Sequence, residues 1–283
     1  MFASGVKRPA VGTAFPVSPE DSMRCLRRTM GNRQTWEQSL RARGREMTDG
    51  GKFWEDLAAE HADALEVHGF DSVKRVQALR YFTWRWGMRR ALLGHQGRYL
   101  LTHSWPSSWL RAALGRVDLS EGAWAPVTWP RGERWLYAIA TRLAWDVARR
   151  HGSPATLALP EPALGSPFPI HWRGRLISQD LANTALEMRS IEEALDGRRP
   201  DHVLELGAGY GRTAYAVLSN YPDASYTIVD IRPAIEISRW YLTALFPNRD
   251  ITFVDGADAD SLARPFDLAI SISSLQEMTP EVV

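Results

Sequence analysis

The pattern of apolar positions changes along the chain. Between about residues 53 and 150, apolar side chains recur at helical spacing. The clearest series is Trp135, Leu136, Ile139, Leu143 and Val147. After Pro200, short continuous apolar runs alternate with amphipathic stretches, which is typical of parallel strands that helices cover on both faces. The sequence therefore predicts a mainly helical N-terminal region followed by an α/β region.

Four strands and two helices are predicted in the α/β region. The strands are Val203–Leu206, Tyr226–Asp230, Ile251–Val254 and Leu268–Ile272, and the helices are about Arg212–Asn220 and Pro233–Leu245. Pro233 fits the first turn of the second helix, and Pro247 ends that helix. Strands that alternate with helices predict a doubly wound, Rossmann-like parallel sheet.

Composition divides the chain into four segments. Residues 1–50 have weak periodicity and predict a poorly ordered basic arm, and residues 51–158 form the helical region. Residues 159–198 contain a Pro-rich connector and an entry helix, and residues 199–283 form the α/β part. Ser178 is predicted to cap the entry helix, and Asp180 suits the positive end of its dipole.

Charge and composition exclude several classes of protein. The net charge of +1 gives no drive toward nucleic acid or membrane, and no apolar run is long enough to span a bilayer. Cys25 is the only cysteine, so an intrachain disulfide and a thiol metal cluster are excluded. The histidines show no metal-ligand spacing. We expect a cytoplasmic protein without a protein-bound metal.

A glycine-rich turn with acidic neighbours is the strongest chemical signal. Glu205 lies near the end of the first predicted strand, and Gly207, Gly209 and Gly211 follow that strand in GxGxG spacing. Glycines allow unusual backbone angles and the close approach of a ligand. A dinucleotide site prefers GxGxxG, whose third glycine would fall at Arg212.

The acids beside this turn favour a cationic cofactor. Glu205 suits the sulfonium or ammonium of S-adenosylmethionine (SAM), and Asp230 can accept hydrogen bonds from two ribose hydroxyls. Taken singly, Glu205 could be a strand-end charge and Asp230 a helix cap. Together they predict a SAM site, with a nucleotide cofactor as the less favoured alternative. Asp255 or Asp258, after the third strand, could accept from the adenine amino group or could be solvated turn residues.

Several segments resemble the bacterial sugar O-methyltransferase family, and the resemblance covers about residues 50–283. The segments are Leu159–Pro162 with Gly165 and Pro167, Ile177–Asn183, Glu205–Ala214, Val229–Ala234 and Ser273–Met278. Phe53–Glu55 and Tyr81–Trp84 are similar to early aromatic motifs of that family. The resemblance implies a class I SAM-dependent O-methyltransferase that acts on a hydroxyl of a sugar or glycosylated small molecule.

The same resemblance implies further site residues. Ala208, Tyr210, Ile231 and Ser273 would join the cofactor site. Asp180 would line the site by the same resemblance. Independently of it, Glu277 lies just beyond the fourth predicted strand, near the carboxyl edge of the sheet, and we hypothesise that it is the general base or orients the acceptor, with Gln276 assisting. Two alternatives remain open, since Glu277 could be an acid at a helix start and Asp180 could serve only the first turn of its helix.

The chain ends at Val283, before the sheet of such a fold would be complete. We therefore expect a C-terminally incomplete enzyme. The alternatives are a truncated SAM-binding protein without turnover and, less favoured, a nucleotide-dependent oxidoreductase.

Overall fold

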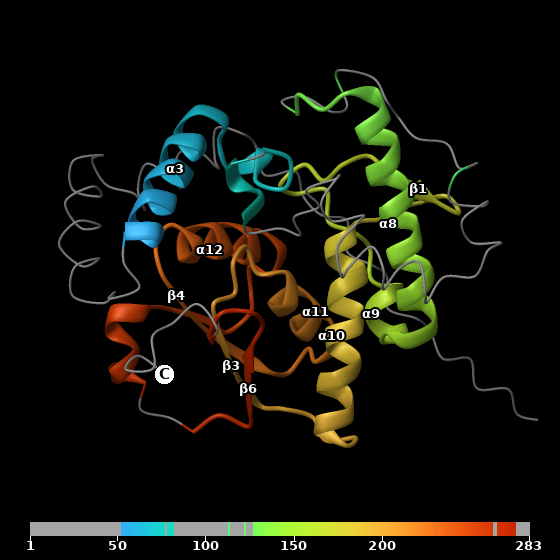
Figure 1. The fold of residues 1–283 in the computed structure, drawn as a ribbon. Helices are drawn as coiled ribbons and strands as arrows, with labels where there is room; N and C mark the ends of the chain where they lie inside the picture. The colour runs from blue at the N-terminus through green and yellow to red at the C-terminus, as the bar shows by residue number, and fades with distance from the viewer. Residues whose placement is uncertain are drawn as a thin grey trace, which may run out of the picture. The chain divides into compact units, whose positions relative to one another are not determined.

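The computed structural model describes residues 52–76, 78–81, 113, 122, 127–262 and 265–275. The chain divides into two compact units, residues 1–42 and 43–283, and the first lies outside the described residues. Figure 1 shows the described elements, which all belong to the second unit.

Helices and short turns make up the described part of the chain before the connector. They are helix α3 (Lys52–His68), the 3-10 turns η1 (Phe70–Ser72) and η2 (Ala78–Tyr81), and helices α8 (Arg131–His151) and α9 (Pro154–Ala158). The apolar series in α8 is buried at Ile139, Leu143 and Val147, but Trp135 is 41% exposed. Trp135 lies in the first turns of the helix, beside exposed Arg131 and Gly132, so the buried apolar stripe begins after it.

The connector holds a hairpin that the sequence did not predict. Strands β1 (His171–Trp172) and β2 (Arg175–Leu176) pair in antiparallel fashion. The two residues between them, Arg173 and Gly174, have φ of 51° and 81°, as a tight two-residue hairpin turn requires. Helix α10 (Gln179–Leu195) follows, and the Ser178 side chain accepts a hydrogen bond from the Leu181 N–H, so the predicted N-cap is confirmed.

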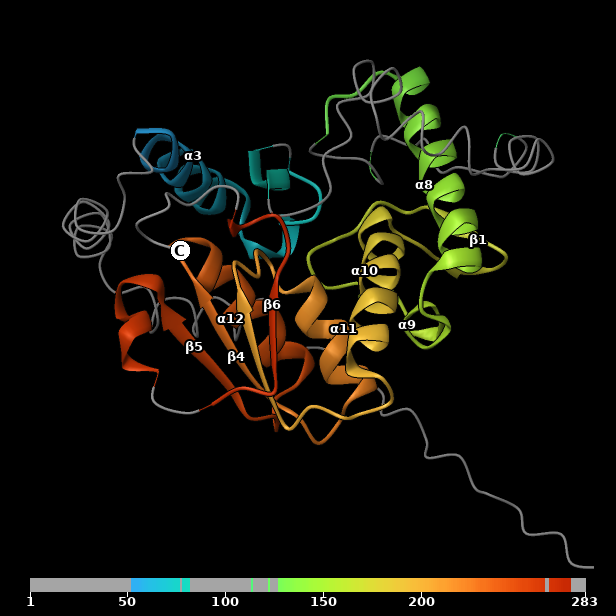
Figure 2. The ribbon, with the colours of Figure 1, turned by 60° about the horizontal axis from the view of Figure 1, so that its bottom comes forward.

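A parallel sheet forms the α/β part, as predicted (Figure 2). Its order is β5-β4-β3-β6, with β3 at His202–Leu206, β4 at Ser225–Asp230, β5 at Ile251–Asp255 and β6 at Leu268–Ser271. Helices α11 (Arg212–Asn220) and α12 (Ala234–Leu245) connect β3 to β4 and β4 to β5. The 3-10 turn η3 (Gly256–Ser261) lies on the path from β5 to β6.

The direction of the chain through the sheet reverses at β3. The chain moves from β3 outward to β4 and β5, and then returns to pair β6 with the other side of β3. Ligands of such sheets bind beyond the carboxyl ends of the strands at this switch point. The turn after β3 therefore occupies the expected position of a ligand site.

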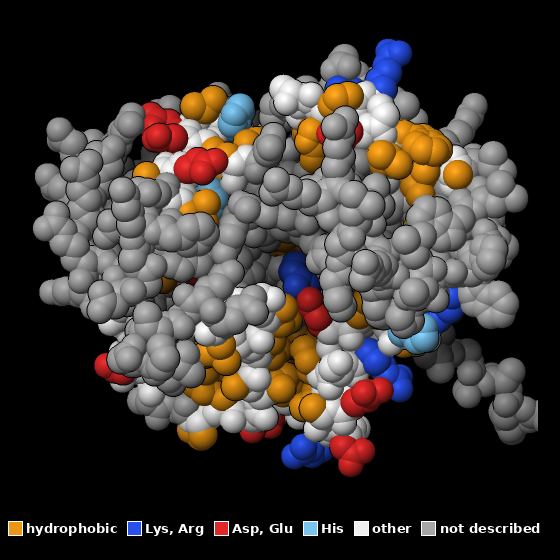
Figure 3. Space-filling model, viewed as in Figure 1, with side chains coloured by type: hydrophobic (Ala, Val, Ile, Leu, Met, Phe, Trp, Pro, Cys, Tyr) orange, Lys and Arg blue, Asp and Glu red, His pale blue; other side chains and the backbone are white. Residues whose placement is uncertain are grey.

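The sheet is not covered equally on both faces. Right-handed crossovers in one direction place α11 and α12 on the same face, and α12 packs against β4 and β5. Strand β4 is buried along both faces, but on β3 Val203 and Glu205 are buried while Leu204 and Leu206 are partly exposed. Figure 3 shows hydrophobic side chains exposed where Figure 1 draws β3 and β6. The expectation that helices cover every strand on both faces is therefore wrong for β3, β5 and β6.

Candidate functional site

The turn between β3 and α11 depends on its glycines. Gly207, Gly209 and Gly211 have φ of 74°, 59° and 95°, a region that side-chain-bearing residues rarely adopt. A Cβ on Gly207 would lie 1.9 Å from the Ser274 hydroxyl oxygen, and one on Gly211 would lie 2.9 Å from a methyl group of Leu242. The turn is thus packed between the segment after β6 and helix α12.

Asp230 lies at the carboxyl end of β4 and contacts the glycine turn directly. Its Oδ2 accepts from the Gly209 N–H at 2.9 Å, and its Oδ1 accepts from the Ile231 N–H at 2.8 Å. Burial raises the pKa of this carboxyl to about 7, although the backbone N–H groups partly offset that effect. A donor such as a ribose hydroxyl would favour the ionised form.

Glu205 lies beneath the turn with 2% of its surface exposed. Its Oε2 accepts from the Tyr226 hydroxyl at 2.8 Å. Burial is the largest influence on its pKa, which rises to about 7, while Tyr226 and the guanidinium of Arg212 lower it. Asp230 raises the pKa of Glu205 further, so the two carboxyls make a strongly negative environment when ionised.

The cation nearest to this turn in sequence, Arg212, already has an anionic partner. Its guanidinium donates to both carboxylate oxygens of Glu187, at 2.6 and 2.7 Å, and to the Thr184 hydroxyl at 2.8 Å. These contacts join α11 to α10. Because Glu187 neutralises Arg212, this guanidinium does not offer a phosphate an open positive charge.

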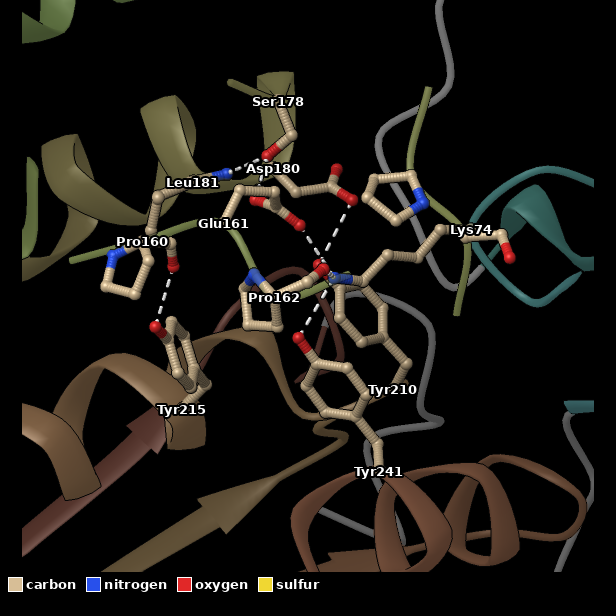
Figure 4. Close-up of polar contacts among 12 residues, drawn as sticks. Lys74, Pro160, Glu161, Pro162, Ser178, Asp180, Leu181, Tyr210, Tyr215 and Tyr241 are labelled. Atoms are coloured by element: carbon tan, nitrogen blue, oxygen red, sulfur yellow. Dashed lines mark hydrogen bonds and ion pairs between the residues drawn. The ribbon is translucent and has the colours of Figure 1, made fainter. Parts of the chain in front are cut away.

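Asp180 of α10 accepts a hydrogen bond from Tyr210, which is part of the glycine turn (Figure 4). Asp180 is 8% exposed, and its Oδ2 accepts from the Tyr210 hydroxyl at 3.1 Å. Tyr210 is 2% exposed and its ring meets Tyr241 edge to face, with centroids 5.1 Å apart. Lys74 and Glu161 complete this buried cluster, and sequence reasoning did not assign either of them to the site. Glu161 stands within a segment that carried the family resemblance, whereas nothing in the sequence singles out Lys74.

The two acids proposed for the adenine, Asp255 and Asp258, lie at the end of β5 and in η3. Asp255 accepts from Arg232 Nε at 3.1 Å and from the Ala257 N–H at 3.3 Å, so it serves as a local cap and ion-pair partner. Asp258 is exposed in η3. Ala208 is buried and Ile231 is partly exposed, and both flank Asp230.

The segment after β6 closes one side of the turn. Ser274 donates to the Gly207 carbonyl at 3.2 Å, and Ser273 is exposed with φ of 64°. The Ser271 hydroxyl is buried and has no hydrogen-bond partner within the described residues. Glu277 and Gln276, the expected base and its assistant, lie outside the described residues.

No described helix has the length and apolar character needed to cross a bilayer. No group of three or more His, Cys, Asp or Glu among those residues is placed to hold a metal ion.

The chain is similar over part of its length to curated methyltransferases. It is 36% identical over 93 residues to the protein-L-isoaspartate O-methyltransferases of Burkholderia vietnamiensis (strain G4 / LMG 22486) and Burkholderia cenocepacia (strain HI2424). The match covers 32% of this chain and 30% of each relative, so the chain spans less than a third of their length. No protein-family profile matches.

Among solved structures, the Podospora anserina methyltransferase PaMTH1, bound to S-adenosylhomocysteine (SAH), is 20% identical with a TM-score of 0.28. That alignment covers 32% of this chain and 42% of PaMTH1. Human N-acetylserotonin methyltransferase in complex with SAM is 17% identical with a TM-score of 0.27, over 87% and 72% of the two chains. TM-scores this low do not establish a relationship.

Proposed function

We propose that this chain binds SAM over the Gly207–Gly211 turn and transfers the methyl group to an oxygen of a sugar or glycosylated small molecule. The observation that carries the proposal is the charge around the turn. Glu205, Asp230 and Asp180 surround it with carboxyls, while Arg212 is neutralised by Glu187. Such a site suits a sulfonium and disfavours the pyrophosphate of a dinucleotide.

The residues of the turn have separate roles in this proposal. The positive-φ glycines let the cofactor approach the backbone, and Asp230 accepts from the ribose hydroxyls. Ala208, Tyr210, Ile231 and Ser273 are proposed to line the same site, with Asp255 or Asp258 toward the adenine. When bound, SAM supplies a methyl group that its sulfonium makes electrophilic.

A hydroxyl acceptor also requires a base close to the reacting oxygen. Glu277 with Gln276 remains our proposed base, and Asp180, which accepts from the Tyr210 hydroxyl, is proposed to line the site. The partial match to isoaspartate O-methyltransferases supports transfer to oxygen and suggests a second acceptor class, the free carboxylate of an isoaspartyl residue. We favour the sugar hydroxyl because the family resemblance extends over more of the chain.

Calorimetric titration with SAM, SAH and NADH tests the cofactor part. We expect SAM and SAH to bind and NADH not to bind, and the reverse result would favour the oxidoreductase alternative. Transfer of a radiolabelled methyl group from SAM to a sugar panel and to an isoaspartyl peptide tests the acceptor. Binding without transfer to either would indicate a SAM-binding protein without turnover.

A further inference from the structure

A glycine turn needs external anchors if it is to keep one shape. Three glycines within five residues lose more conformational freedom on ordering than other residues would. Tyr210 is the only large side chain in this turn and is therefore the natural point at which to hold it. The contacts that hold the Tyr210 side chain therefore determine how well the turn is preformed for a cofactor.

Three separate elements hold Tyr210 (Figure 4). Asp180, in the first turn of α10, accepts from its hydroxyl at 3.1 Å. Tyr241 of α12 packs against its ring. Lys74, from the segment after η1, places its ammonium 5.1 Å from the centroid of the Tyr210 ring and 4.8 Å from that of Tyr241. A desolvated cation at this distance attracts an aromatic face substantially.

The ammonium of Lys74 is buried and fully engaged. It donates to Glu161 Oε1 at 2.7 Å and to the Tyr241 hydroxyl at 2.9 Å, and its side chain is 3% exposed. Burial lowers the pKa of Lys74, but Glu161 and Tyr241 raise it more, so the pKa lies above its usual value and the group stays charged. Glu161 in turn accepts from the Ser178 hydroxyl at 2.5 Å, which ties the pair to the cap of α10.

The segment that carries Lys74 is docked independently of that ammonium. The Lys74 N–H donates to the Gly165 carbonyl at 2.9 Å, and Arg75 Nε donates to the Ser166 carbonyl at 3.2 Å. The Phe70 ring contacts Trp240 of α12, with centroids 5.5 Å apart. The segment can thus remain in place when the ammonium is removed. A variant of Lys74 can therefore show the effect of its charge on Tyr210 separately from the docking of the segment.

We propose that Lys74 is a positioning residue for the cofactor turn. It lies outside the α/β part and acts on the turn by holding the ring of Tyr210. The proposal rests on the proposed function, because the ligand that benefits is SAM. It makes cofactor affinity depend on the segment at residues 70–76. Lys74 itself contacts neither the reacting atoms nor the cofactor in this proposal.

The test uses the double variant Lys74→Met with Glu161→Gln in the full chain. Lys74→Met alone would leave Glu161 buried without its cation and could unfold the protein, whereas the double variant removes both charges and retains the volume. Arg75→Met is the matched control, because it weakens docking of the same segment without touching Tyr210. The readouts are the SAH dissociation constant, the thermal midpoint and amide hydrogen exchange at residues 207–212.

We expect the double variant to keep a midpoint near that of the wild type, to bind SAH about tenfold more weakly and to exchange faster at residues 207–212. Arg75→Met should keep SAH affinity within about twofold of the wild type. Unchanged affinity and protection in the double variant would overturn the proposal, as would equal losses in both variants. If the wild type does not bind SAH, the proposed function fails, and exchange in ligand-free protein still decides whether Lys74 orders the turn.

Discussion

At the scale of single residues, Asp230 links the fold to the proposed chemistry. Asp230→Asn keeps the shape of the side chain but weakens it as an acceptor of ribose hydroxyls. We expect SAH affinity to fall about 10- to 100-fold, the usual effect of losing charged hydrogen bonds. Isothermal titration calorimetry at pH 8 measures the change.

Asp267→Asn is the matched control for that prediction. Asp267 also accepts backbone N–H bonds, from Asp201 at 3.0 Å and His202 at 2.8 Å, but at the amino edge of the sheet. We expect it to leave SAH affinity unchanged. Equal losses in the two variants would show that general destabilisation, and not ribose recognition, explains the effect.

Glu205 predicts an unusual dependence of stability on pH. Its pKa rises from 4.5 in the unfolded reference to about 7 in the folded protein. Between these values the unfolded chain releases the proton while the folded chain retains it, so this group's contribution to stability falls as pH rises from about 4.5 to 7. Above about pH 7 the loss is complete, on the order of 3 kcal/mol.

Glu205→Gln isolates that effect, because glutamine imitates the protonated acid at every pH. The stability of the variant relative to the wild type should increase from pH 5 to pH 8. Denaturant unfolding of both proteins across that range gives the difference. A difference that does not vary with pH would show that Glu205 has an ordinary pKa.

Gly207→Ala probes the turn itself. The new Cβ would meet the Ser274 hydroxyl and would force a positive φ on alanine. We expect destabilisation of about 1–3 kcal/mol and loss of SAH binding. Gly174→Ala supplies the comparison, because it has φ of 81° but nothing within 4 Å of its Cβ. It should destabilise the fold and leave affinity intact.

At the scale of the elements, Ser178 joins the cap of α10 to the buried cluster. Ser178→Ala removes the acceptor for the Leu181 N–H and the donor to Glu161. We expect a loss of about 1–2 kcal/mol in the free energy of unfolding. Ser219→Ala is the control, because within the described residues Ser219 bonds back to the Tyr215 carbonyl of its own helix. We expect it to change the free energy of unfolding by a few tenths of a kcal/mol.

The helices and strands were predictable wherever the local pattern of apolar residues matches the pattern of burial in the fold. Helix α11 has the bounds that the sequence predicts, and β4 and β5 differ from the prediction by one residue. The β1–β2 hairpin was not predicted, because two-residue strands carry no periodicity and Arg173-Gly174 is a weak turn signal. The Lys74–Glu161 pair joins residues 87 apart in sequence, and no local pattern encodes such a contact.

Within the candidate site, the sequence predicted which residues lie around the turn better than it predicted which side chains contact one another. Glycine spacing and strand-end acids place Glu205, Gly207 and Asp230 around one turn, because parallel strands bring their carboxyl ends together. The spacing does not reveal that Tyr226 bonds Glu205 from the neighbouring strand. Such contacts depend on cross-strand register and side-chain rotamers, which emerge only when the sheet is assembled.

At the scale of the whole molecule, cofactor binding should stabilise the fold, because only the folded chain has the turn. A SAH concentration 100-fold above the dissociation constant contributes about 2.7 kcal/mol, which corresponds to a rise of about 5–10 °C in the thermal midpoint. Differential scanning fluorimetry measures it, with NADH as the comparison. An equal rise with NADH would contradict selective recognition of the cationic cofactor and its product.

The most direct test of the account is a crystal structure of the full chain with SAH. We predict that the nucleoside lies over Gly207–Gly211, with both ribose hydroxyls within hydrogen-bond distance of the Asp230 carboxylate. SAH bound at another surface, or its absence from crystals of folded protein grown in excess ligand, would contradict the account.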